Sequence, residues 1–314
     1  MTKYRFVFAC LGIALGLATA TPSHAQNNHS YVSGVGTGTA CTLAAPCADF
    51  TTAIAVTNPR GVISCVDGVT TTTLSSLSIT KTITIDCAGT SATQSNIVIN
   101  GANIVVTLRN LTINGFGTNT NPGIDFQNGE ALFVEHCAIE HWGAGNGVAI
   151  NFAPSTALAK LNVTDTVIKN NGTGTVGGGI IVNPASGGST RVLIERTQLE
   201  RNTYGIVASG ASGPSLIEVR NSNIADVGKD GIFAYTSGGP IVSVVLDHSS
   251  ATFISGNGVH ASGSGAYVSL NDSTVAWSAT GLNAENGGLI LSYKNNLIAG
   301  NPSPGTAPIQ FDLK

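Results

Sequence analysis

Charged side chains are scarce in this chain of 314 residues: Lys, Arg, Asp and Glu together make up only 10% of it. The sequence contains no basic run, which argues against nucleic-acid binding. After the first 25 residues there is no apolar stretch long enough to cross a bilayer, so we expect no membrane insertion. Sustained helical periodicity is also missing, which argues against helices crossing between parallel strands.

What the chain does contain is a short apolar alternation that returns eight times. An apolar residue is followed two positions later by a second one, and then by polar residues. The second apolar positions, or anchors, are Leu108, Val134, Val163, Ile194, Val219, Leu246, Leu270 and Tyr293. The partners two positions earlier are Val106, Leu132, Leu161, Val192, Ile217, Val244, Val268 and Leu291. Alternation indicates strands, and a recurrence of roughly 26 residues indicates a solenoid.

Each repeat holds two further apolar segments. A third apolar position follows each anchor, at Ile113, Ile139, Ile168, Leu199, Ile224, Ile254, Val275 and Ile298. After a polar turn, a glycine then opens another short strand, as in "GIVA" at Gly205 and "GIFA" at Gly231. Three short strands per repeat without helices close only as stacked coils. The predicted fold is therefore all-β: three parallel sheets wound around an apolar interior.

This pattern resembles the right-handed parallel β-helix of the pectate-lyase-like superfamily, over roughly Val62 to Ile298. The segments "YVSGVG", "CTLAAPC", "ITIDC", "SYKNN" and "AGN" are also similar to those of a group of secreted bacterial β-helix proteins. In pectate-lyase-like enzymes the substrate groove lies along the sheet that corresponds here to the glycine-opened strands. The resemblance thus implies that any carbohydrate site lies on that sheet.

The chain ends predict export and capping. Residues 1–25 read as a signal peptide: Lys3 and Arg5, then an apolar run, then "SHA" before the expected cleavage after Ala25. Residues 1–25 contain two basic residues and no acidic ones, so the remaining chain has 12 basic and 17 acidic residues, and its net charge is 12 − 17 = −5. We expect a secreted or periplasmic monomer with an N-terminal segment and cap at 26–61, a β-helix at 62–300 and a tail at 301–314. A short helix over 48–57 should cover the first coil.

Five cysteines follow the predicted signal peptide, and an exported protein can keep disulfides. Cys41 and Cys47 could close a small loop. Cys65 and Cys87 are separated by close to one coil, so they could face each other on stacked strands. Cys137 remains, at an inward position of its repeat, and we expect it to be a buried free thiol.

Polar columns follow the anchors, and we interpret them as structural. The second column contains Asn110, His136, Asp165, Arg196, Asn221, His248, Asp272 and Asn295. A tight bend explains Asn and Asp at such positions, because they tolerate unusual backbone angles. His136 and His248 lie four coils apart, roughly 19 Å by strand spacing, which is too far to share a zinc ion. The sequence has no Asp-x-Asp cluster for calcium, and we expect neither a metal nor a cofactor.

The candidate site lies on the glycine-opened sheet. Its predicted substrate-binding residues are Tyr204, Phe233, Tyr235 and His260, where aromatic rings beside polar groups suit a sugar. Its predicted catalytic residues are Asp226, Asp230, Lys229 and Arg201, which are charged groups on the turns leading into that sheet. A hydrolase needs two carboxyl groups about 5 to 10 Å apart, and a lyase needs a base and a cation.

Two classes of function stay open. The first is a protein that acts on or binds extracellular polysaccharide or a cell-surface glycan; as an enzyme it would be a polysaccharide lyase or a glycoside hydrolase. The second is a non-catalytic structural, surface or adhesive module. The sequence lacks the calcium-binding Asp cluster of pectate lyases and the "NTD", "DD" and "GHG" motifs of polygalacturonases. Convergent acids with perturbed pKa values would favour an enzyme, and an evenly polar surface would favour the module.

Overall fold

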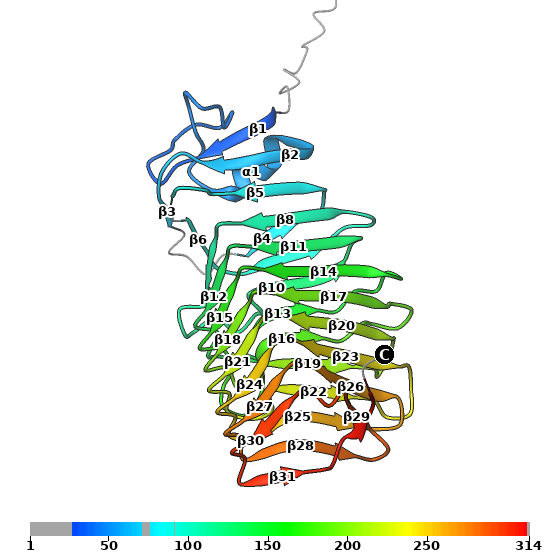
Figure 1. Ribbon diagram of the computed structural model, residues 1–314. Coiled ribbons are helices and arrows are strands. Elements are labelled where there is room, and N and C mark those ends of the chain that lie inside the picture. The colour runs from blue at the N-terminus through cyan, green and yellow to red at the C-terminus, as the bar shows by residue number, and fades with distance from the viewer. Residues whose placement is uncertain (1–26, 71–75, 91, 313–314) are drawn as a thin grey trace, which may run out of the picture.

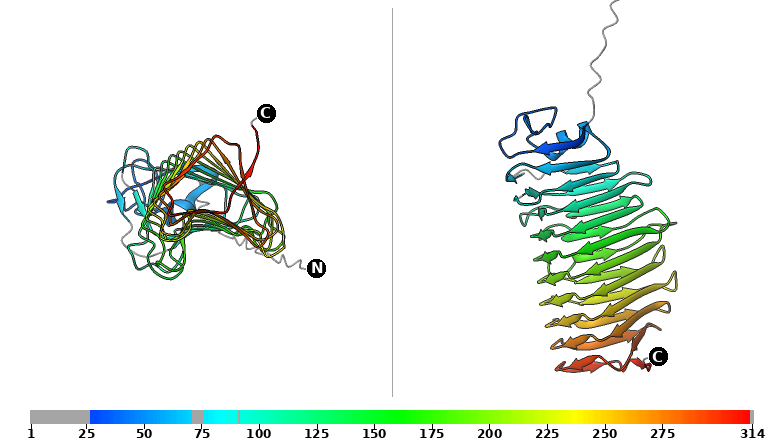
Figure 2. Two further views of the ribbon diagram at one scale, coloured as in Figure 1. Left: turned by 60° about the horizontal axis from the view of Figure 1, so that its bottom comes forward. Right: turned by 45° about the horizontal axis from the view of Figure 1, so that its top comes forward.

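The chain is wound into a right-handed parallel β-helix whose coils stack along one axis (Figures 1 and 2). A computed structural model describes residues 27–70, 76–90 and 92–312. Each coil contributes one strand to each of three parallel sheets, which we number in the order in which the chain meets them. The predicted fold class is confirmed, and the predicted signal peptide lies outside the described residues.

The first sheet has 12 strands and carries the anchors. Its strands are β1 (Asn27–Val32), β2 (Thr57–Cys65), β5 (Ile83–Asp86), β8 (Val105–Arg109), β11 (Ala131–Glu135), β14 (Ala159–Thr164), β17 (Thr190–Glu195), β20 (Ser215–Arg220), β23 (Val242–Asp247), β26 (Ala266–Asn271), β29 (Leu289–Ser292) and β32 (Ile309–Gln310).

The second sheet has 10 short strands. They are β3 (Val69–Thr70), β6 (Ala92–Gln94), β9 (Thr112–Asn114), β12 (Ala138–Glu140), β15 (Val167–Lys169), β18 (Gln198–Glu200), β21 (Asn223–Ala225), β24 (Ser250–Thr252), β27 (Thr274–Ala276) and β30 (Leu297–Ala299).

The third sheet, which is the glycine-opened one, also has 10 strands. They are β4 (Leu77–Ile79), β7 (Ile97–Asn100), β10 (Ile124–Asn128), β13 (Val148–Phe152), β16 (Gly178–Val182), β19 (Ile206–Ser209), β22 (Ile232–Tyr235), β25 (Asn257–Ser262), β28 (Thr280–Glu285) and β31 (Ser303–Gly305).

The interior is built from the predicted apolar ladder. Val163 pairs with Val134 on one side and with Ile194 on the other, and all three are fully buried. Because side chains of a strand alternate between faces, every second residue of each strand enters this core. The stacked register places equivalent residues of successive coils in contact, so the core grows along one axis rather than around a centre.

Three predicted inward positions are wrong. In the last coil, Ile290 and Ser292 pair with the inward residues of β26, so Leu291 and Tyr293 face outward. A one-residue slip reverses every side chain of a strand. The apolar alternation of Leu289, Leu291 and Tyr293 favours the predicted register, but pairing with β26 turns these residues outward. In the second sheet, Ala251 rather than Ile254 occupies the inward position of β24. Ile254 is buried beyond the following bend.

The bend between the first and second sheets confirms the structural interpretation of its polar column. Seven residues of that column, from Asn110 to Asp272, have positive φ values between 42° and 57°. Behind the bend, buried hydroxyls accept hydrogen bonds from the backbone N–H groups of the preceding coil. Ser222 Oγ accepts from Thr197 N at 3.1 Å, and Ser249 Oγ from Ser222 N at 3.0 Å. The buried backbone of each bend is thereby satisfied.

The N-terminal end is closed by helix α1 (Phe50–Val56), close to the predicted range, which packs against β1, β2 and β4 (Figure 1). Asp49 caps it by accepting a hydrogen bond from Thr52 N at 2.7 Å. Phe50 and Ile54 turn inward and cover the first coil, as expected. No helical segment in the described part of the chain has the length and apolar character needed to cross a bilayer.

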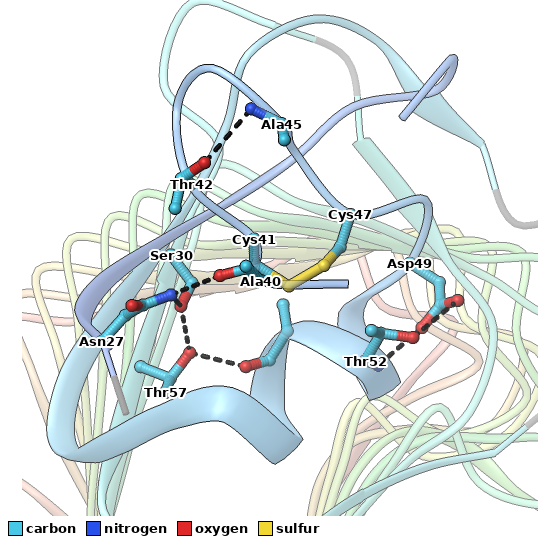
Figure 3. The surroundings of a disulfide bond; sticks show 11 residues. Asn27, Ser30, Ala40, Cys41, Thr42, Ala45, Cys47, Asp49, Thr52 and Thr57 are labelled. Atoms are coloured by element: carbon cyan, nitrogen blue, oxygen red, sulfur yellow. Dashed lines mark hydrogen bonds between the residues drawn. A yellow bond between two sulfur atoms is a disulfide. The ribbon is translucent and has the colours of Figure 1, made fainter. Parts of the chain in front are cut away.

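The cysteine prediction is confirmed. Cys41 pairs with Cys47 beside α1 (Figure 3), and Cys65 pairs with Cys87 on neighbouring coils. Both pairs have Cα atoms 4.7 Å apart. Cys137 is a buried free thiol, and burial raises its pKa to about 12. A thiol with that pKa is not a nucleophile at neutral pH, so its role is packing.

Candidate functional site

The third sheet alternates as the sequence predicts, with a row of glycines at the start of its strands. Ile206, Ile232 and Val259 are fully buried on the inner side. A side chain at Gly205 or Gly231 would clash with the backbone of the next coil, since a Cβ atom would lie 2.4 Å from Gly231 O or 2.7 Å from Gly258 O. Only glycine therefore lets the coils approach closely where this sheet begins.

The outward side of this sheet carries the four residues predicted to bind substrate. Phe233 forms the centre: its ring centroid lies 4.4 Å from that of His260, 5.0 Å from Tyr235 and 6.5 Å from Tyr204. All these pairs are stacked, with interplanar angles of 21° to 23°. We call Tyr204, Phe233, Tyr235 and His260 the aromatic cluster. Because Phe233 shares its faces with neighbours, a ligand would meet the ring edges and the outer face of Tyr235.

The outward side is less exposed than alternation suggests. Val207 and Ser209 point to this side and are nevertheless buried. Ala149, predicted to point outward, belongs to the hydrophobic core instead. Val207 lies beside Phe233 on the next strand, and Ser209 lies beside Tyr235. Large aromatic side chains cover their small neighbours, which the pattern of a single strand cannot show.

Asp230 stands directly before β22 and is held by three hydrogen bonds. Its Oδ2 lies 2.9 Å from His260 Nδ1, and its Oδ1 accepts from Asn257 N at 3.1 Å and Asn257 Nδ2 at 2.8 Å. Burial alone would raise the pKa of Asp230, but the bonds from His260 and Asn257 outweigh it, so the pKa is lowered. Asp230 is therefore a carboxylate at neutral pH and a partner of His260, not a ready proton donor.

His260 sits between two carboxylates. Its Nε2 lies 3.3 Å from Glu285 Oε1, and this nitrogen is buried without an aligned hydrogen bond. Its side chain is 12% exposed, whereas that of Glu285 is 47% exposed. Burial would lower the pKa of His260, but the hydrogen bond and charge of Asp230, together with Glu285, raise it. The imidazole is thus stabilised in its charged form, as the cation of a three-membered Asp–His–Glu arrangement.

Lys229 borders the aromatic cluster on the side of the turns. Its Nζ donates to Thr175 O at 2.9 Å and lies 5.4 Å from the ring centroid of Tyr204. Thr175 belongs to a glycine-rich turn two coils away, in which Gly172, Gly174 and Gly177 have positive φ values. The ammonium group therefore joins this turn to the cluster through one hydrogen bond and one cation–π contact.

Arg201 and Asp226 lie apart from the buried pair, on the exposed bend between the second and third sheets. Both have left-handed backbones, with φ values of 52° and 53°. Arg201 Nε donates to Asn170 Oδ1 at 3.1 Å, and within the described residues Asp226 makes no side-chain hydrogen bond or ion pair. The structure thus brings Asp230 and Lys229 to the cluster and places Arg201 and Asp226 on the bend beside it.

Some features of this region escaped the sequence analysis. Asn257 holds Asp230, and Glu285 completes the pairing of His260. Phe253 and Trp277 form a further exposed stack on the same bend as Asp226, with centroids 5.0 Å apart and exposed fractions of 54% and 57%. The spacing of one coil between His260 and Glu285 offered a signal for their contact, but the direction of each side chain did not follow from it.

The surface of the third sheet also has a small hollow toward the N-terminal end, with a volume of about 240 Å³. It is lined by Pro122, Asn146, Val148, Asn151, Val176, Gly177 and Ile181. Gly177 belongs to the same glycine-rich turn that Lys229 holds. Across the described ranges, no group of three or more His, Cys, Asp or Glu side chains is arranged to hold a metal ion.

Comparison with known proteins supports the fold. Residues 95–275 match a family model described as a right-handed β-helix region. Among solved structures, the crystal structure of pectate lyase Pel9A is similar, with a TM-score of 0.64 at 14% identity, over 90% of this chain and 79% of that one. A likeness at this identity concerns the fold alone. No curated protein matches the sequence.

Proposed function

Since this chain belongs to the right-handed β-helix family, whose members present long parallel sheets to solvent, we propose that it binds polysaccharide through the outward face of its third sheet. The observation that carries the proposal is the aromatic cluster with its polar border. An extended sheet also suits an extended polymer, because equivalent positions recur every 4.8 Å or so along it. The solved structure of a pectate lyase with this fold supports a role related to polysaccharides.

A sugar ring needs an apolar contact together with hydrogen-bond partners at its rim. Tyr235 supplies both through its ring and its hydroxyl group, and it packs on Phe233 on one side only. Ser262 lies on the adjacent strand β25 and Glu285 on the strand after it, β28, and they add a hydroxyl and a carboxylate. This combination of an aromatic surface and a few convergent polar groups is typical of ligand sites.

The test is to replace Tyr235 by Ala and measure binding to a panel of immobilised polysaccharides. We expect a loss of roughly tenfold in affinity, about the free energy of one aromatic contact, with an unchanged melting temperature. Tyr267→Ala is the matched control, because Tyr267 is a half-buried tyrosine on the outward face of the first sheet. If Tyr267→Ala abolishes binding and Tyr235→Ala does not, the polysaccharide binds to the first sheet, and the proposal that it binds to the third sheet is wrong.

Export is the second part of the proposal. Two disulfides are consistent with an extracellular or periplasmic location, where thiols are oxidised. Together with the signal peptide expected at residues 1–25, they support secretion. N-terminal sequencing of the protein recovered outside the cytoplasm tests this: a mature chain that starts at Gln26 supports it, and an uncleaved chain retained in the cytoplasm contradicts it.

Catalysis by Asp226, Asp230, Lys229 and Arg201 stays a separate prediction. Asp230 is engaged by His260 and Asn257, and this arrangement favours binding over acid catalysis. Asp226 is the freer carboxylate of the two. If the protein cleaves a polysaccharide, Asp226→Asn or Asp230→Asn should abolish turnover while binding persists, measured by the release of reducing ends or of unsaturated products.

The second candidate is a structural, surface or adhesive module without an enzymatic reaction. The observation that favours it is the pairing of charges along the axis, both on the first bend and at the ends of the first-sheet strands that precede it. Arg196 forms two bonds to Asp165 at 2.8 and 2.9 Å, and Arg109 bridges Asp86 and Glu135. Such pairing along the axis is expected of a rigid rod. If none of the polysaccharides in the panel binds, the structural, surface or adhesive module becomes the favoured function.

A further inference from the structure

We infer that the polysaccharide held at the aromatic cluster is uncharged rather than a polymer of uronic acids, an inference that rests on the proposed function. The cluster has cationic neighbours, as a site for acidic sugars would. Each of them, however, is already engaged by another group of the protein.

Lys229 and His260 are the cations that touch the cluster, and both have partners. Lys229 Nζ is bonded to Thr175 O and lies over the Tyr204 ring. His260 is bonded to Asp230 at one nitrogen and lies against Glu285 at the other. To bind a uronate carboxylate, His260 would have to leave these partners. Lys229 keeps two further N–H donors, but its ammonium group stays beside Thr175 O and the Tyr204 ring. Separating His260 from Asp230 would also leave a buried carboxylate unpaired, which is costly.

The charges of the region cancel. With His260 protonated, the positive groups are Lys229, His260 and Arg201, and the negative groups are Asp226, Asp230 and Glu285. The sum is 3 − 3 = 0, and it becomes −1 when His260 is neutral. The whole chain also has a formal net charge of −3. A polyanion would therefore meet no attractive field in approaching this face.

Recognition of carboxylates in proteins relies on accessible Arg or Lys side chains, which form charge-assisted hydrogen bonds. Arg201 is the exposed member of the set, but it lies on the bend, where its Nε is bonded to Asn170 and its neighbour on the next coil is Asp226. The groups left available at the cluster are aromatic rings, hydroxyls, the Glu285 carboxylate and the two unused donors of Lys229. Those groups suit the hydroxyls of neutral sugars, which can donate to Glu285.

The test measures the binding of two sets of polymers to the complete mature protein. A β-glucan, a xylan, a mannan and a galactan represent neutral polysaccharides; polygalacturonate and alginate represent acidic ones. Affinity electrophoresis or calorimetry at low ionic strength favours any electrostatic contribution, since salt screens it. We expect one or more neutral polymers to bind with little dependence on salt, to bind at least tenfold more tightly than either acidic polymer, and to lose affinity in Tyr235→Ala.

Glu285→Gln gives a second, independent readout. This exposed substitution removes the negative charge that faces His260 Nε2, so the region becomes net positive when His260 is protonated. At about pH 6, near the ordinary pKa of histidine, the affinity for polygalacturonate should rise by about fivefold, the strength of an exposed ion pair, and the gain should disappear at high salt. Glu218→Gln, on the outward face of the first sheet, is the control for the change in overall charge.

The outcomes separate the two proposals. If polygalacturonate or alginate binds the unmodified protein more tightly than every neutral polymer, the inference is overturned while the proposed function survives. An equal gain in Glu218→Gln and Glu285→Gln also overturns it, because overall charge would then explain the effect. If no polysaccharide of either set binds, the proposed function and the inference fall together.

Discussion

Val163 offers the sharpest test of the stacked interior. It lies in the middle of β14, fully buried, with Val134 and Ile194 at the same position of the neighbouring coils. Val163→Asp would place a carboxylate in an apolar column without a cationic partner. Asn162→Asp, the matched control, introduces the same charge one residue earlier, on the outward side of the same strand, where Asn162 is half-buried.

The expected cost follows from two contributions. Removing the buried valine side chain loses about 1.5 to 3 kcal/mol of apolar burial. An uncompensated charge in the interior adds about 3 to 5 kcal/mol, judged from buried ion pairs that lose one partner. The sum is about 5 to 8 kcal/mol, comparable to the whole free energy of unfolding of an ordinary domain, about 5 to 15 kcal/mol.

The assay is the yield of soluble protein together with its thermal denaturation, followed by circular dichroism. Val163→Asp should yield little folded protein or denature at a much lower temperature, whereas Asn162→Asp should behave like the unmodified chain. A Val163→Asp protein with normal yield and melting temperature would refute the reasoning, because the column would then not be a dry interior.

Two further predictions concern the disulfides and the pH dependence of stability. Cys65→Ala should lower the free energy of unfolding by about 3 kcal/mol, since the bond to Cys87 closes a loop of roughly one coil, and Cys137 should react with thiol reagents only after denaturation. The lowered pKa of Asp230 stabilises the fold above the ordinary pKa of aspartate, and this contribution is lost as the pH falls through the lowered value. The raised pKa of His260 stabilises the fold below the ordinary pKa of histidine, and this is lost as the pH rises through the raised value. Melting temperatures of the unmodified protein should therefore peak between the two, and Asp230→Asn should flatten the profile; an identical profile would contradict the pairing.

The repeating pattern alone was sufficient for the architecture. Strand alternation with a recurrence near 26 residues allows one packing of short strands without helices, and the solenoid follows. The pairing of Cys65 with Cys87 followed from the same period, because residues one coil apart lie side by side. The pattern failed in the last coil. There Leu291 and Tyr293 continue the apolar alternation better than Ile290 and Ser292 do, and pairing with β26 decided against them.

The sequence by itself determined the coils, the columns and the face on which aromatic residues gather. Tertiary structure decided how the side chains of that face pair. Residues one coil apart are neighbours for geometric reasons, but which atoms meet depends on rotamers and on the shape of the turns. Asp230 bonds to His260 and Asn257 on the next coil, and Lys229 crosses two coils to Thr175. Linear spacing does not give the atoms that meet in these contacts, and the contacts set the charge available to a ligand.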